Sequence, residues 1–166
     1  MTDKQKHIAL GMAAAVVWGV AVIWIGTAFV EVPMMMRQLV GPFYAMAPGV
    51  VLMLMIGRIA QRRFFDAGLI DGAAPAPGSA ADIDNRVLKN TVEQSVLALC
   101  LWPAISVMLF TDGPGVVLAL SVGFAVARLA FWWGYHKSPP LRAFGFAATF
   151  YPTVLALLWA LVLRLF

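Results

Sequence analysis

Five long apolar runs, separated by shorter polar segments, dominate the pattern of this chain. A bilayer core about 30 Å thick needs about 20 apolar residues in helical form. The pattern therefore predicts an all-α protein with five transmembrane helices. They are expected at about residues 8–30, 39–57, 94–110, 116–135 and 143–163.

The composition supports this interpretation. Of the 166 residues, 62% are apolar and 12% are charged, which is more apolar side chain than a soluble domain of this size can bury. The formal net charge of +4 is small and calls for no nucleic-acid partner. Cys100 is the single cysteine, so a disulfide framework is excluded. We expect a multi-pass integral membrane protein.

Basic residues gather on one side of the predicted membrane, with Arg37 and Arg164 on the other. By the positive-inside rule, the N-terminus is expected to be cytoplasmic and the C-terminus outside, in the inner (plasma) membrane. The first run is too long for a cleaved signal, and a mobile loop is expected at about 64–84. The basic residues on the cytoplasmic side are Lys4, Lys6, Arg58, Arg62, Arg63, Arg86, Lys89, Lys137 and Arg142.

Polar residues enter the head of the third run in the segment RVLKNTVEQS. Arg86, Asn90 and Glu93 are spaced i, i+4 and i+7, so they share one helical face, with Lys89 at its edge. Arg86 and Lys89, taken alone, could instead be cationic side chains that extend to the lipid headgroups. An acidic side chain gains nothing from such a position. We therefore expect Glu93 to be buried and paired inside the bundle.

The end of the fourth run and the start of the fifth read ARLAFWWGYHKSPPLRAFGF. Arg128 and Tyr135 share a helical face, and the two tryptophans between them suit an interfacial aromatic belt. Arg128 lies about two turns inside the run and needs an acidic partner, for which Glu93 is the natural candidate. Arg142 stands near the start of the fifth run, where a guanidinium and free backbone N–H groups together favour an anion.

These side chains together favour a small zwitterionic ligand with a net negative charge. Arginines would hold its carboxylates, Glu93 would hold an ammonium group, and a cation beside a thiol would lower the thiol pKa. No metal site is predicted, because His7 and His136 are expected to be isolated, at a terminus and in a loop. The sequence contains no pattern of a catalytic triad or a phosphate-binding loop.

The two motifs resemble those of the MAPEG family, the membrane-associated proteins of eicosanoid and glutathione metabolism. RVLKNTVEQS is similar to the family's R-x-x-x-N-x-x-E motif, and the second segment is similar to its arginine, aromatic, GY, loop and arginine motif. The resemblance covers about residues 43–166. It implies a four-helix core at 37–166 in a homotrimer, with residues 1–36 as an additional N-terminal transmembrane helix.

The resemblance also implies that glutathione is a cosubstrate, bound between subunits near the cytoplasmic face. Arg142 would stabilise its thiolate. One of Arg58, Arg62 and Arg63 would also take part. Phe131 replaces an expected tyrosine or histidine, and Ala143 offers no hydroxyl. The implied glutathione-binding residues are Arg86, Lys89, Asn90, Glu93, Arg128 and Tyr135.

We therefore expect a glutathione-dependent membrane transferase or peroxidase. Its second substrate would be a hydrophobic electrophile or lipid hydroperoxide from the bilayer. The alternative is a non-catalytic protein on the same bundle, which binds small anions or lipids or assembles with a partner. A transporter is disfavoured, because the polar residues cluster on one side and the sequence contains no inverted repeat.

Overall fold

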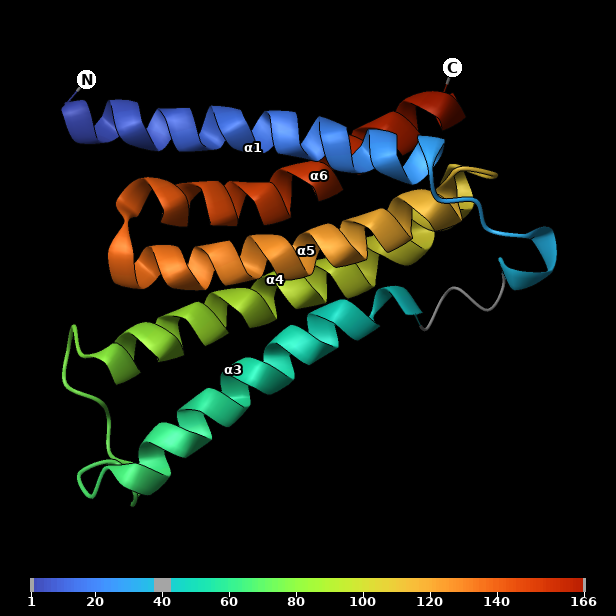
Figure 1. Cartoon of the computed structure of the whole chain (residues 1–166). Helices are drawn as coiled ribbons and strands as arrows, with labels where there is room; N and C mark the ends of the chain where they lie inside the picture. The colour runs from blue at the N-terminus through green and yellow to red at the C-terminus, as the bar shows by residue number, and fades with distance from the viewer. Residues whose placement is uncertain (1, 38–42, 166) are drawn as a thin grey trace.

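The computed structural model describes residues 2–37 and 43–165, and these contain helices and no strands (Figure 1). The prediction of an all-α protein is confirmed, and five of the helices in the described residues are long. The prediction that all five cross the membrane is confirmed for four of them. The helices are α1 (Asp3–Ala28), a short 3₁₀ helix (Met34–Met36), α3 (Met46–Phe65), α4 (Ala80–Met108), α5 (Gly113–Lys137) and α6 (Pro139–Leu165).

Four of these helices, α1, α4, α5 and α6, are long and apolar enough to cross a membrane. The fifth, α3, has 20 residues, and arginines occupy its last two turns. Its apolar part is therefore shorter than the roughly 20 residues that a span requires. Leu39, where the second span was expected to begin, lies outside the described residues. The prediction of a multi-pass membrane protein is confirmed.

The connection between α3 and α4 is shorter than the loop predicted at about 64–84, because only residues 66–79 lie between the two helices. Ser79 caps α4, and its hydroxyl accepts a hydrogen bond of 3.2 Å from the backbone N–H of Asp82. This Ser-x-x-Asp start makes both Asp82 and Asp84 helical. As a result, Asp84 is buried within the bundle rather than placed in a loop.

The additional helix α1 packs against α6 and α5, on the side of the bundle away from α3 (Figure 1). A Cβ atom on Gly11 would overlap the backbone of α6, and one on Gly26 would overlap the backbone of α5. Glycines at these two points let the helix axes approach closely. The N-terminal helix is therefore an integral part of the packed bundle.

Successive long helices run in opposite directions, so the connections alternate between the two ends of the bundle (Figure 1). The N-terminus, the 66–79 segment and the α5–α6 junction lie at one end, which we call the basic end. The C-terminus and the α4–α5 turn lie at the other. The basic segments predicted to share a side thus lie together.

Trp102 of α4 anchors the core of the bundle. Only 1% of its surface is exposed, and its ring packs edge-to-face against Phe124 of α5. Its indole Nε1 donates a hydrogen bond of 3.1 Å to the hydroxyl of Thr153 on α6. A buried indole with a satisfied N–H thus joins α4, α5 and α6 in the core of the bundle.

Candidate functional site

Arg128 of α5 is completely buried, with 0% of its surface exposed. Its Nη1 donates a hydrogen bond of 2.8 Å to the side-chain oxygen of Asn90 on α4. Its guanidinium lies 4.0 Å from the ring centroid of Phe131. Within the described residues, Nε and Nη2 have no hydrogen-bond partner. A buried cation with unused donors favours a further acceptor at this position.

We expected Glu93 to pair directly with Arg128, but the structure does not show this pair. Its carboxylate accepts a hydrogen bond of 3.2 Å from the side-chain nitrogen of Asn90, and Glu93 is exposed on α4. Asn90 stands between the two charges, with its oxygen toward Arg128 and its nitrogen toward Glu93. The prediction of a buried and directly paired Glu93 is wrong, because an amide that both donates and accepts bridges the two charges.

Arg142 joins the same group of residues through aromatic rings. Phe131 packs edge-to-face against Tyr135, with 5.1 Å between centroids, and the guanidinium of Arg142 lies 4.9 Å from the Tyr135 centroid. Arg142 is in the first turn of α6, as predicted. Contacts thus run without a break from α4 to α6. We call the connected residues the motif cluster: Glu93, Asn90, Arg128, Phe131, Tyr135 and Arg142.

Two glycines set the separation of α5 and α6 beside this cluster. A Cβ atom on Gly134 would overlap the backbone of α6 at Arg142, and one on Gly145 would overlap the backbone of α5 at Phe131. Without side chains, the two backbones can approach closely. The glycine of the GY pair therefore brings Arg142 next to Tyr135.

Arg86 and Lys89 lie on the outer face of α4, where both are exposed. Arg86 forms an ion pair of 2.9 Å with Asp82, one turn earlier. Exposed residues continue along this face at alternating spacings of three and four, which is the spacing used when one helix packs along another. We call this face the α4 stripe: Arg86, Lys89, Glu93, Val96, Cys100, Pro103 and Val107.

A second polar cluster, which the sequence did not predict, surrounds Asp84 on the other side of α4. Asp84 is 3% exposed and forms an ion pair with Arg62 of α3. It also accepts hydrogen bonds from Trp132 Nε1 (2.7 Å) and lies 3.0 Å from His136 Nε2. His136 is therefore helical and paired, not isolated in a loop. The i, i+4 spacing of Trp132 and His136 was the available signal.

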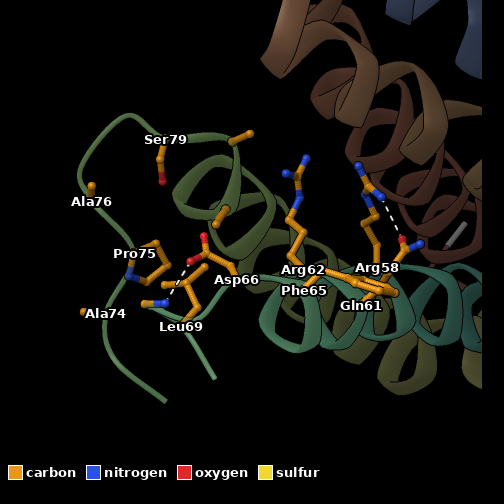
Figure 2. A pocket seen from close by; sticks show the side chains of 13 residues that line it. Arg58, Gln61, Arg62, Phe65, Asp66, Leu69, Ala74, Pro75, Ala76 and Ser79 are labelled. Carbon is orange, nitrogen blue, oxygen red and sulfur yellow. Dashed lines mark hydrogen bonds between the residues drawn. The ribbon is translucent and has the colours of Figure 1, made fainter. Parts of the chain in front are cut away.

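The three arginines at the end of α3 differ in their surroundings. Arg62 pairs with Asp84, Arg58 donates a hydrogen bond of 2.7 Å to Gln61, and Arg63 is exposed. Arg58 and Arg62 line two neighbouring cavities of about 590 and 660 Å³. Figure 2 shows the first cavity, where these two arginines project from the same side of α3. Residues of the motif cluster line neither cavity.

Comparison with known proteins identifies the family. The MAPEG family model matches residues 41–162. The chain belongs to the MAPEG family. No curated protein and no solved structure matches it.

The match to the MAPEG family covers α3, α4, α5 and most of α6, and it begins after α1. Both sequence motifs of this MAPEG protein lie within it. The predicted resemblance is therefore confirmed, and the protein belongs to a membrane family of glutathione and eicosanoid metabolism. Of the residues predicted for the site, the structure joins Asn90, Glu93, Arg128, Tyr135 and Arg142 in one cluster. It places Arg86 and Lys89 on the adjacent exposed stripe, and Arg58 and Arg62 at the Asp84 side.

Proposed function

We propose that this MAPEG protein is a glutathione-dependent membrane transferase or peroxidase. The observation that carries the proposal is the motif cluster, which connects residues of both motifs in one series of contacts across three helices. Arg128 has unused donors for a carboxylate, and Arg142 provides a cation at the edge of the cluster. These groups suit the carboxylates and thiol of glutathione.

Glutathione would bind between adjacent subunits of a homotrimer. The exposed α4 stripe supports this arrangement, since its spacing fits a helix–helix interface and it includes Arg86, Lys89 and Glu93. A ligand held there would contact the charged head of α4 from one side. A neighbouring subunit would close the other side of the site and exclude water from the thiol.

The reaction would begin when the glutathione thiol loses its proton, because the positive charge of Arg142 stabilises the thiolate. In a transferase reaction the thiolate attacks an electrophilic carbon, a C–S bond forms, and the leaving group departs with the electron pair. With a lipid hydroperoxide, the thiolate attacks the O–O bond. The products are an alcohol, after proton uptake, and a sulfenic acid, which a second glutathione converts into the disulfide and water.

The basic end of the bundle would face the cytoplasm, with the C-terminus outside the inner (plasma) membrane. Basic connections at one end support this orientation. Soluble glutathione would then enter from the cytoplasm, and the hydrophobic substrate would enter from the bilayer.

The proposal is tested by titration of the detergent-purified protein with glutathione while thiolate absorbance and melting temperature are followed. S-methylglutathione separates the two readouts, since it can bind but cannot ionise. Glutathione should raise both signals at neutral pH, and the analogue should raise only the melting temperature. If glutathione changes neither signal, the proposed enzyme is wrong.

Arg142→Ala should remove thiolate formation while much of the binding remains. Arg164→Ala is the matched control, because Arg164 also lies over an aromatic ring, 3.9 Å from the Phe110 centroid, but in the last turn of α6 rather than the first. A parallel loss of binding and ionisation in Arg142→Ala would contradict the thiolate role of Arg142.

A second candidate function is binding of small anions without catalysis. Two observations favour it: the Phe131 ring lies against Arg128 where a hydroxyl would offer a ligand contact, and Ala143 has no hydroxyl beside Arg142. Stabilisation by both glutathione and its S-methyl analogue, with no thiolate signal, would support this function.

A further inference from the structure

A cavity of about 660 Å³, lined by both charged and apolar side chains, opens between α3 and α5 at the basic end, and we call it the α3–α5 groove. Its volume falls within the range of ligand sites in proteins, roughly 300–1,000 Å³. The lining residues come from three helices: Arg58, Arg62, Asp84, Leu129, Trp132, Trp133, His136 and Lys137.

The groove carries a net positive charge. Three permanent cations, Arg58, Arg62 and Lys137, face one carboxylate, Asp84. Asp84 pairs with Arg62, whereas Arg58 is bonded to the neutral amide of Gln61. A positive excess therefore remains in the groove and favours an anionic ligand.

Asp84 also fixes the shape of the groove. It is 3% exposed and holds the Arg62 guanidinium, the Trp132 indole N–H and the His136 ring from α3 and α5. Bonds of this kind lock side chains that would otherwise rotate. The groove is thus a built cavity whose walls are joined at its base.

Exposed apolar side chains form one wall of the groove. Leu129 is 49% exposed and Trp133 is 65% exposed, and both lie toward the bilayer from the basic groups at the end of α5. Tryptophan and arginine side by side at the end of a span are typical of the headgroup region of a bilayer. A ligand in this groove would meet cations at its head and apolar surface along its tail.

The groove is separate from the motif cluster. On α5, the motif cluster uses Arg128, Phe131 and Tyr135, which share one face of the helix. The groove uses the residue that directly follows each of them, namely Leu129, Trp132 and His136. One residue turns an α-helix by about 100°. The two sets of side chains therefore point in different directions from α5.

We propose that the α3–α5 groove binds the headgroup of an anionic phospholipid from the surrounding bilayer. Arg58 and Lys137 hold the phosphate, and Leu129 and Trp133 pack against the upper acyl chain. Basic pockets between transmembrane helices on the cytoplasmic side are suited to anionic lipid headgroups. The apolar wall favours a lipid over a free soluble anion, because a soluble anion leaves that wall without a partner.

The test uses the full chain in a neutral detergent and three probes: short-chain phosphatidylglycerol, phosphatidylcholine of the same chain length, and inorganic phosphate. The melting temperature is followed as a function of probe concentration, which gives an apparent affinity. Phosphatidylglycerol should raise the melting temperature at concentrations where the other two probes have little effect. Equal stabilisation by phosphate would overturn the lipid assignment, and equal stabilisation by phosphatidylcholine would overturn the role of charge.

The variant Arg58→Gln/Lys137→Gln should weaken phosphatidylglycerol binding by about fivefold for each cation removed. Both side chains lack an ion pair with Asp84, so the base of the groove stays intact. The matched control is Arg63→Gln/Lys6→Gln, which removes one arginine and one lysine from exposed positions at the same end. The control should keep the affinity of the parent, and an equal loss in both variants would show that general surface charge attracts the lipid.

Discussion

Asn90 is the side chain on which the buried charge of Arg128 depends. Its oxygen accepts the 2.8 Å hydrogen bond from Arg128, whose other two guanidinium nitrogens have no partner among the described residues. A hydrogen bond to a charged group contributes about 1.5–3 kcal/mol to stability. Breaking a buried pair and leaving its charge alone costs about 3–5 kcal/mol. We therefore expect Asn90→Ala to lower the free energy of unfolding by about 3 kcal/mol.

The same reasoning predicts strong coupling between the two residues. Arg128→Met removes the charge that Asn90 satisfies, so adding Asn90→Ala to it should cost much less than Asn90→Ala costs in the parent. The expected coupling free energy is about 2 kcal/mol. Unfolding is measured by circular dichroism during titration with a denaturing detergent, for the parent, both single variants and the double variant.

Asn85→Ala is the control for this cycle. Like Asn90, Asn85 is a half-buried amide on α4, but it does not belong to the motif cluster. Its truncation should therefore change stability by about 0.5 kcal/mol or less. If Asn90→Ala and Arg128→Met are additive, or if the Asn90 variant is as stable as the Asn85 variant, Asn90 does not support the buried charge.

Three further predictions concern the bundle and its assembly. Asp84→Ala should lower the free energy of unfolding by about 3–5 kcal/mol, because it leaves the partly buried Arg62 side chain without its carboxylate. The same truncation at exposed Asp71 should have little effect, and equal melting temperatures would contradict the burial argument. Gly145→Ala should destabilise the protein by forcing α5 and α6 apart, whereas Gly57→Ala, where a Cβ atom meets nothing within 4 Å, should be neutral or gain up to about 1 kcal/mol. If the subunits of a homotrimer meet along the α4 stripe, oxidation in membranes should link Cys100 to Cys100, and the appearance of monomers alone on a non-reducing gel would argue against that interface.

The apolar pattern was sufficient to predict the helices, since hydrophobic length in a bilayer is a property of consecutive residues. The apolar pattern was less informative about the residues at which each helix begins and ends. The α4 helix begins at Ala80 because Ser79 caps it, and this local signal was masked by a stretch rich in alanine, proline and glycine. Because the loop was predicted to extend to residue 84, Asp84 was assigned to it, and the polar cluster around Asp84 was not predicted.

The motifs predicted which polar residues gather, because i, i+4 and i+7 spacing fixes the face of a single helix. Pairing across helices depends on distances that spacing does not contain. The direct pair of Glu93 and Arg128 was expected from their charges, but in the packed bundle Asn90 stands between them. The sequence likewise offered three equivalent arginines at the end of α3.

The sequence by itself thus determined the membrane class, the helix count, the common end of the basic segments and the two motifs of the family. The tertiary structure decided that Asn90 bridges the two charges, that glycines bring Arg142 to Tyr135, and that Arg62 turns toward Asp84. The division has a physical cause. Periodicity and length act along one helix, whereas partners, burial and grooves arise only when several helices pack together.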